Sequence, residues 1–227
     1  MAFIIFLVVV GVAFYFYKSS PLGDSAIVKA RYKNRSEEQK KVIRYFLVDG
    51  CLTKTISDQE YEALVKSHLA KTNFKQRGLE KVGLDEDELK EIEPVTFEGY
   101  LFDNKNLAKR GQDGVWRSSA YQVSWLFFSS TQVYLYQNTF NLDEDGKSEI
   151  TEEYFYKDIT NFSTSSDRVE TPYWDKKQKR MLKQNVDTNR FQLTVPGDKF
   201  YCFMEQNEYT ERAIQAMKAK LREKKSA

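Results

Sequence analysis

The first seventeen residues carry no charged side chain, and this restricts the chain more than any other feature of its sequence. Residues 2–17 read AFIIFLVVVGVAFYFY, a run without a strongly polar side chain. As a helix this run would span roughly 24 Å, close to the short limit for the hydrocarbon core of a bilayer. Tyr15 and Tyr17 lie at one end, where interfacial aromatic residues are common. We therefore expect a transmembrane anchor over residues 1–18.

Two other interpretations of this run are a cleaved signal peptide and a buried core helix. No Lys or Arg precedes the run, and no small-residue cleavage motif follows it. The run is also longer than the apolar region of a usual signal peptide, which has about 7–15 residues. These features favour an uncleaved anchor.

The charges that flank the run predict its orientation. The cations that follow it are Lys18, Lys29, Arg31, Lys33 and Arg35. Because cytoplasmic flanks of membrane helices are enriched in Lys and Arg, we expect a single-pass protein of the cell membrane with its N-terminus outside and its soluble body in the cytoplasm. Residues 19–34 contain Ser-Ser-Pro and a Gly, which is typical of a juxtamembrane linker.

The rest of the composition excludes several classes of protein. The chain has 227 residues, and 35 Lys and Arg against 33 Asp and Glu leave a formal net charge of only +2. This balance disfavours a nucleic-acid-binding protein, for which a strongly basic domain is expected. One His and two Cys exclude a disulfide scaffold and a zinc site built from His and Cys, and they argue against an enzyme.

Residues 35–93 are predicted to form a helical segment. Ser36 with Gln39 and Ser57 with Glu60 make two capping boxes, each followed by apolar residues at helical spacing. Asp85 begins a third predicted helix, with Leu89 and Ile92 behind it and Pro94 at its end. Residues 74–82 fit a further short helix, although Gly78 is unfavourable there.

Residues 94–227 are predicted to form a β-domain that ends in a helix, which makes the whole chain an α+β protein. Segments rich in Tyr, Val, Phe and Trp alternate with turn sequences and indicate antiparallel strands. The predicted strands cover residues 96–102, 119–128, 132–142, 153–159, 191–195 and 199–203. The final helix covers residues 206–225, and its apolar stripe of Ala213, Ile214, Met217 and Leu221 should pack against the open end of the β-domain.

Two parts of the chain resemble known families. The hairpin WLFFSSTQVYLYQNTFNL, the strand EEYFYKDITNFS, the strand FQLTVPGDKFYCFM and the helix after it resemble bacterial pleckstrin-homology-like and GRAM-like domains. This resemblance covers about residues 95–225 and implies an antiparallel barrel or sandwich capped by the C-terminal helix. Residues 165–190 depart from a compact version of that fold. The segment LVDGCLTKTISDQEYEALVKSHLA resembles the two-helix SHOCT module, with stretched spacing.

An acidic segment at residues 141–152 matches much of an EF-hand loop. Asp143, Asp145, Gly146 and Glu149 occupy the expected positions, and such a loop could supply oxygens to Ca²⁺. The flanking sequences read as strands rather than helices, so a hairpin turn built on Asp-Gly is the favoured interpretation. His68 lies on the apolar face of a predicted helix, where packing or a helix-end charge is favoured over catalysis.

The feature that points to binding is the basic sequence Lys176-Lys177-Gln178-Lys179-Arg180, with Lys183 nearby. It follows Pro172-Tyr173-Trp174, with Asp175 between them. Cations beside exposed aromatic rings suit an anionic lipid headgroup or a phosphate-rich partner, although charge runs are usually solvated loops. We expect Trp174, Lys176, Lys177, Lys179 and Arg180 to be the contact residues.

The sequence therefore favours a membrane-anchored binding or scaffolding module that engages anionic phospholipid or a protein near the bilayer, without a cofactor. An alternative is a metal-dependent enzyme whose site would contain Asp143, Asp145 and Glu149. A second alternative is a protein that only oligomerises through its helices.

Overall fold

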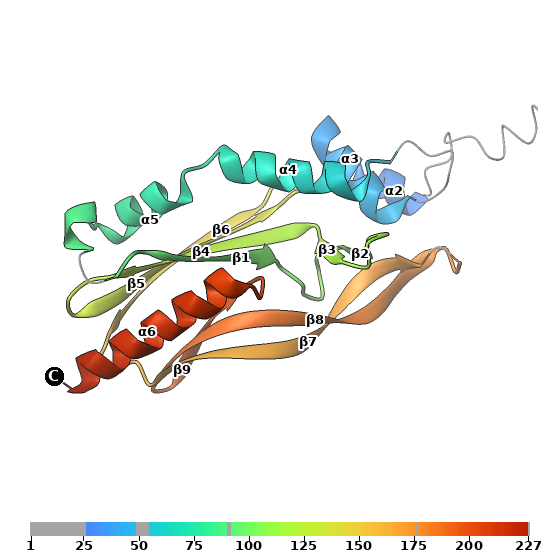
Figure 1. The fold of residues 1–227 in the computed structure, drawn as a ribbon. Helices are drawn as coiled ribbons and strands as arrows, with labels where there is room; N and C mark the ends of the chain where they lie inside the picture. Colours follow the sequence, from blue (N-terminus) through green and yellow to red (C-terminus); the bar gives the residue numbers. More distant parts are fainter. Residues whose placement is uncertain (1–25, 49–54, 90–91, 176, 227) are drawn as a thin grey trace, which may run out of the picture.

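The computed structural model describes residues 26–48, 55–89, 92–175 and 177–226 (Figure 1). These residues form three layers: a layer of helices, a first sheet (sheet A) and a second sheet (sheet B), with the C-terminal helix beside the two sheets. The expected anchor at residues 1–18 lies outside the described residues. Within the described ranges, no helix has both the length and the apolar character needed to cross a membrane.

The helical layer contains α2 (Ala26–Arg31), α3 (Glu37–Leu47), α4 (Asp58–Ala70) and α5 (Phe74–Val82). Both predicted capping boxes are confirmed, because the side chains of Ser36 and Ser57 accept hydrogen bonds from the backbone N–H groups of Gln39 and Glu60. The short helix α5 is also present. Its Gly78 faces sheet A so closely that a Cβ atom would lie 2.9 Å from the Phe127 ring.

The prediction of a helix that begins at Asp85 is wrong. The described residues of this segment contain only the 3₁₀ turn η1 (Glu86–Glu88), where the Glu88 carboxylate accepts from the Asp85 N–H at 3.0 Å. On a helix, Leu89 and Ile92 would lie three residues apart on one face. In the structure they pack against different hydrophobic cores, which one regular helix cannot achieve.

Sheet A is antiparallel and has the strand order β1-β4-β5-β6. Its strands are β1 (Val95–Tyr100), β4 (Ala120–Phe128), β5 (Gln132–Asn141) and β6 (Lys147–Phe155). The two strands at its centre confirm the aromatic segments predicted from the sequence. β6 begins earlier than the strand predicted at residues 153–159, because the turn before it is tight and Asn141 N–H already donates to Gly146 O at 3.1 Å. It also ends earlier, because a second turn follows it, in which Asp158 N–H donates to Phe155 O at 2.9 Å.

Sheet B has the strand order β3-β2-β7-β8-β9. Its strands are β2 (Ala108–Arg110), β3 (Trp116–Ser118), β7 (Asn161–Asp175), β8 (Arg180–Val195) and β9 (Asp198–Phe203). All its pairs are antiparallel except one parallel contact, between β2 and β7. In this sheet the sequence predicted strands at residues 191–195 and 199–203, and the second is confirmed by β9, whereas β7 and β8 form a long hairpin. Residues 165–190 contain mostly Ser, Thr, Asp, Asn and charged residues, so no apolar period marks these strands.

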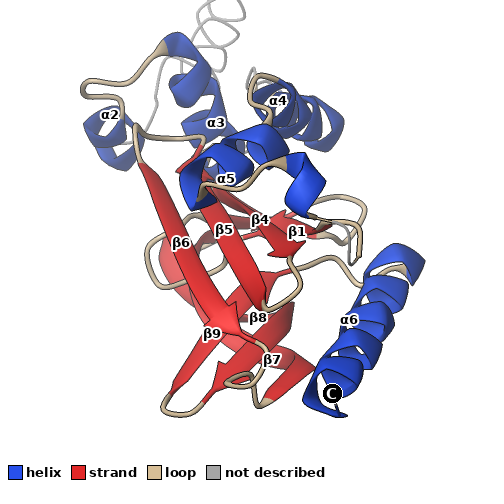
Figure 2. Cartoon of the chain, turned by 90° about the vertical axis from the view of Figure 1, so that its left-hand side faces the viewer, coloured by secondary structure: helices blue, strands red, loops and turns tan. Residues whose placement is uncertain are grey.

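The two larger hydrophobic cores lie on opposite faces of sheet A, and a smaller cluster contains Phe102, Ala108 and Val186. The helical core joins the helices to one face, and the inter-sheet core fills the space between the other face, sheet B and the C-terminal helix (Figure 2). The helical core includes Val28, Ile43, Phe46, Tyr61, Leu79, Tyr121, Val123, Phe127, Tyr136 and Phe140. The inter-sheet core includes Phe97, Leu126, Leu135, Phe162, Phe191, Leu193, Cys202, Ile214, Met217 and Leu221. Eight of the nine residues of β4 are consequently buried.

The C-terminal helix α6 (Glu208–Ser226) confirms the last predicted element. Its buried residues Ile214, Met217 and Leu221 face the inter-sheet core, as their spacing indicates. The α+β class is therefore confirmed. Of the two architectures left open by the sequence, the described strands form two separate sheets and no closed barrel.

Candidate functional site

The predicted basic loop is the tip of the β7–β8 hairpin. The two strands pair up to Asp175 and Arg180, and residues 177–179 belong to the turn between them. The Asp175 carboxylate accepts from the Gln178 N–H at 2.6 Å, which fixes the turn. Lys179 has φ +50°, a left-handed conformation that also belongs to a tight turn. The tip is therefore built by the hairpin itself rather than by a long loop.

The cations at this tip differ in whether they form hydrogen bonds or ion pairs with other described residues. Lys177 and Lys179 are exposed, and neither has a hydrogen bond or ion pair with any residue that the structure describes. Arg180 is exposed too, and its Nε donates to Gln178 Oε1 at 2.9 Å. Lys183 is paired across the hairpin with Glu170 at 2.5 Å. Lys176 lies outside the described residues. Lys177 and Lys179 are thus the cations most available to a ligand.

Trp174 has a different position from the one expected. Its indole is half-buried and packs against the helical core, together with Met181 on the facing strand. It lines one cleft with Phe46 of α3. Trp174 therefore anchors the hairpin to the helical layer, and it does not stand free beside the cations.

The fold brings further residues to the tip that sequence reasoning missed. Lys109 and Arg110 on β2, Trp116 on β3 and Tyr173 on β7 line, with Trp174 and Lys177, a cleft of about 420 Å³. The rings of Trp116 and Tyr173 meet edge to face, with centroids 6.3 Å apart. The Lys-Arg pair is visible in the sequence, but only the parallel contact between β2 and β7 places it beside the hairpin.

Not all of these charges are free. The ammonium of Lys109 donates to Tyr45 O at 2.7 Å and lies 4.2 Å from the centroid of that ring. Arg110 Nε donates to Gly114 O at 3.0 Å. These contacts hold the two side chains in place, so they contribute fixed positive charge at the edge of the cleft.

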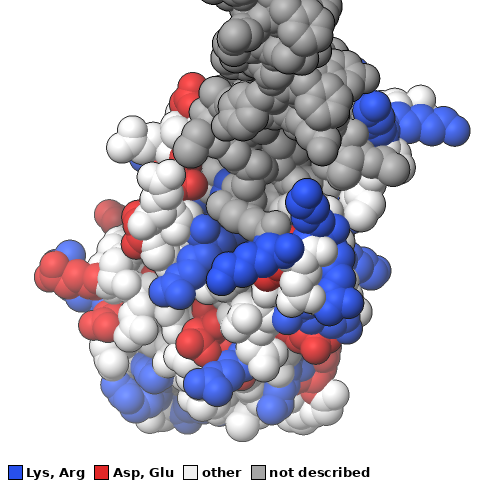
Figure 3. Space-filling view, turned by 90° about the vertical axis from the view of Figure 1, so that its right-hand side faces the viewer, with Lys and Arg blue, Asp and Glu red and all other residues white. Residues whose placement is uncertain are grey.

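The tip lies at the same end of the molecule as α2, the first described helix (Figure 1). The exposed cations Lys29 and Lys33 belong to this end of the chain. Viewed from this end, Lys and Arg side chains gather across the middle of the face, with acidic side chains among and around them (Figure 3). We call Lys109, Arg110, Lys177, Lys179 and Arg180 the basic end.

The acidic turn does not assemble the metal site that the enzyme alternative requires. Asp143 is buried, and burial raises the pKa of its carboxyl. Asp145 accepts from Gln39 Nε2 at 2.6 Å. Glu149 is bound to Arg77 and also accepts from Tyr136 OH at 2.8 Å, and the bond from Arg77 is the main reason that its pKa falls to about 2.

These carboxylates hold helices against sheet A, and they do not point to one centre. No group of three His, Cys, Asp or Glu residues among those described could hold a metal ion. The strands β5 and β6 on both sides of the turn agree with the hairpin interpretation of Asp145-Gly146.

His68 and Cys202 are packing residues. The His68 ring stacks on Phe140 with centroids 4.1 Å apart, and burial lowers its pKa, which favours the neutral form. The Cys202 side chain lies in the inter-sheet core, where burial raises the pKa of the thiol to about 12. A thiol of that kind is a poor nucleophile at neutral pH.

No family model, curated protein or solved structure matches the chain. The fold and the basic end therefore define the molecule by themselves: an α+β protein with two sheets, a covering layer of helices and a concentration of cations at one end.

Proposed function

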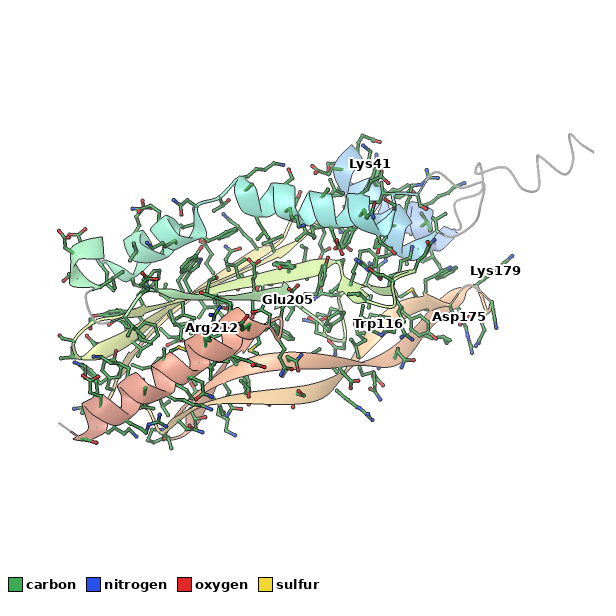
Figure 4. The ribbon with its side chains drawn as sticks, viewed as in Figure 1. Lys41, Trp116, Asp175, Lys179, Glu205 and Arg212 are labelled. Carbon is green, nitrogen blue, oxygen red and sulfur yellow. The ribbon has the colours of Figure 1, made fainter. Side chains whose placement is uncertain are left out.

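We propose that this chain is a membrane-tethered binding module whose basic end contacts anionic phospholipid headgroups. The observation that supports this most directly is the position of Lys177 and Lys179. They are exposed cations without a described partner, and they project from the hairpin at the end where the described chain begins. Figure 4 shows Lys179 at the extreme of this end, beyond Asp175 and Trp116.

The expected anchor would bring this end to the membrane. Residues 2–17 form the apolar run, and α2 begins at Ala26. The connection between them could extend over roughly 30 Å at most. On this proposal the anchor spans the cell membrane once, the body lies in the cytoplasm, and the hairpin tip faces the inner leaflet.

Electrostatic attraction of this kind is modest for each residue. A cation near an anionic bilayer surface contributes about 1 kcal/mol, and the effect decays within a Debye length. Lys177, Lys179 and Arg180 would together contribute about 3 kcal/mol. A tether raises the local lipid concentration, so weak contacts suffice to orient the body on the bilayer.

The resemblance to pleckstrin-homology-like and GRAM-like domains is part of the same proposal. Consecutive antiparallel strands followed by the helix α6 support it, and α4, a capped helix within residues 47–70, is what supports the resemblance to the SHOCT module. The extended β7–β8 hairpin would then be an elaboration that carries the lipid-binding cations.

Flotation with liposomes tests the lipid contact. The protein should begin at Ser19, because Val28 of α2 is buried in the helical core and a shorter chain would lose it. We expect this protein to float with vesicles that contain phosphatidylserine and to stay behind with phosphatidylcholine vesicles. Replacing Lys176, Lys177, Lys179 and Arg180 by Gln should abolish flotation.

The matched control removes the same charge from the opposite end of the molecule. Its four substitutions to Gln are at Lys199, Lys218, Arg222 and Lys225, on β9 and α6. This variant should float like the unmodified protein. An equal loss of flotation in the two variants would show that net charge, and not the basic end, determines binding. Unchanged flotation of both variants would contradict the proposal.

A further inference from the structure

A second cleft, of about 710 Å³, lies between α4, the edge of sheet A, β8 and the segment that leads into α6. Figure 4 shows its residue Glu205 midway along the molecule, well away from Lys179 at the hairpin tip. The walls are aromatic and apolar, and they include Tyr100, Phe102, Trp116, Tyr121 and Phe203. We call this space the acidic cleft because of the side chains described next.

Two residues that line this cleft, Glu98 and Glu205, carry carboxylates without described cationic partners. The backbone N–H of Glu205 donates to the backbone carbonyl of Glu98 at 3.2 Å, which brings the two residues together. Neither side chain forms an ion pair within the described part of the chain. The Glu98 carboxylate remains accessible, while the surrounding walls and the charge of Glu205 raise its pKa.

The remaining charges of the cleft leave this pair uncompensated. Glu62 is bound to Arg117, and Asp187 pairs with Arg168 at 3.1 Å. Lys66, on α4, is the only cation among the residues that line the cleft. Two like charges in a partly desolvated space repel each other, and a cationic group placed between them would relieve that repulsion.

The cleft also exposes part of the edge of β1. The N–H of Leu101 donates to Ala120 O on β4. Because residues of an antiparallel pair alternate in their bonding, the N–H and C=O of Tyr100 point away from β4. Two neighbouring outward groups are already used: Thr96 N–H donates to Tyr209 OH, and Glu98 O accepts from Glu205. The backbone N–H and C=O of Tyr100, a residue that lines the cleft, form no such backbone bond to a described residue.

We propose that the acidic cleft binds an extended, basic segment of a partner protein. The segment pairs with the free edge at Tyr100 and places a Lys or Arg side chain between Glu98 and Glu205. A guanidinium or ammonium there would form charge-assisted hydrogen bonds with the carboxylates and pack its stem on the aromatic walls. Addition of a strand to a sheet edge supplies affinity through the backbone, and the charged pocket supplies specificity.

The charge of the cleft distinguishes this partner from the ligand of the basic end. Carboxylates repel phosphate groups, so anionic lipid is excluded from this position. The free N–H and C=O groups at a strand edge suit the backbone of another extended polypeptide. The proposal is thus independent of lipid binding and adds a second ligand of opposite charge at a different position.

The test uses the full chain in discs of zwitterionic lipid and four acetylated, amidated pentapeptides. Each has the sequence Thr-Val-X-Val-Thr, where X is Arg, Lys, citrulline or Glu, and fluorescence anisotropy reports binding. We expect the Arg and Lys peptides to bind roughly tenfold or more tightly than the citrulline peptide, and the Glu peptide not to bind. An Arg peptide with N-methylated valines should bind more weakly, because it cannot pair with the strand edge.

The variant with Glu98→Gln and Glu205→Gln should lose the preference for Arg over citrulline. The matched variant with Glu152→Gln and Glu153→Gln, two exposed residues of β6, should keep it. The proposal is overturned if no peptide binds, if citrulline replaces Arg without loss, or if the two variants behave alike. Circular dichroism melting of both variants shows whether they are folded, and neither pair of substitutions removes an ion pair between described residues.

Discussion

The guanidinium of Arg77 on α5 donates two hydrogen bonds to the carboxylate of Glu149 on β6, one of them at 2.8 Å from Nη2 to Oε2. The same carboxylate accepts from Tyr136 and Asn138 on β5. One acidic residue therefore connects the helical layer to two strands of sheet A.

Replacing Glu149 by Ala should lower the free energy of unfolding by about 1–3 kcal/mol. The substitution leaves partly buried donors of Tyr136 and Asn138 without their acceptor. Glu149→Gln retains a carbonyl acceptor and should cost less. Urea denaturation of the two variants gives the comparison, and an equal loss would mean that the ion pair with Arg77 alone matters.

The same contact predicts a pH dependence. The pKa of Glu149 falls to about 2 in the folded protein, whereas the ordinary value is 4.5. The unfolded chain takes up the proton first, so the stabilisation is complete above about pH 4.5 and is lost as the pH falls toward 2. Urea midpoints measured across this range should therefore decline more steeply for the unmodified protein than for Glu149→Gln.

Gly78 should not tolerate a methyl group. A Cβ atom would lie 2.9 Å from the Phe127 ring and 3.1 Å from Tyr136. Ala favours helix by about 1 kcal/mol over Gly, but overpacking at such a contact costs about 1–3 kcal/mol. Gly78→Ala should thus be neutral to destabilising despite its propensity. Glu80→Ala, on the exposed side of the same helix, is the control and should leave the thermal midpoint unchanged within about 1 °C.

Arg117 should be among the charged residues that matter most for stability. Its side chain is 2% exposed and is bound by Glu62 and by Asp113, the latter at 2.6 Å. Arg117→Met should cost about 1–3 kcal/mol, because a buried side chain loses its hydrogen bonds to two carboxylates. Arg168→Met breaks an exposed pair with Asp187 and should cost about 1 kcal/mol or less. Similar losses in denaturant titrations would contradict this ranking.

Calcium should not stabilise the protein through the acidic turn. Ca²⁺ requires six to eight oxygens around one point, whereas Asp145 is bonded to Gln39 and Glu149 to Arg77. Millimolar Ca²⁺ should leave the melting temperature unchanged, with Mg²⁺ and Mn²⁺ as parallel tests. A rise with any of these ions would restore the metal-dependent alternative, since a ligand of the folded state raises the melting temperature.

The elements that could be predicted were those with a local or periodic signal. The helices that follow Ser36 and Ser57 could be predicted because a capping box involves only four consecutive residues. The helix α6 and the central strands of sheet A show apolar spacing, because one or both of their faces are buried. Burial leaves a pattern in the sequence even when the partner surface is unknown.

The elements that were missed depend on contacts between distant segments. The middle of the β7–β8 hairpin, where residues 165–168 pair with residues 187–190, is polar on both faces, so its pairing has no periodic signature. Trp174 packs against a core that contains Phe46, which lies 128 positions earlier in the chain. Glu98 and Glu205 are similarly distant, and only the path from β9 to α6 brings them together.

Sheet A contributes residues to both the helical core and the inter-sheet core, and this determines how the molecule can unfold. If the helices detached, solvent would be in contact with Tyr121, Val123 and Phe127 together, as one apolar face. If sheet B detached, the opposite face of the same strands would be uncovered. Neither half can melt without destabilising the other, so heat should unfold the described body in a single cooperative transition. Ligands at the basic end and in the acidic cleft would then both raise the temperature of that one transition, although they bind at different positions.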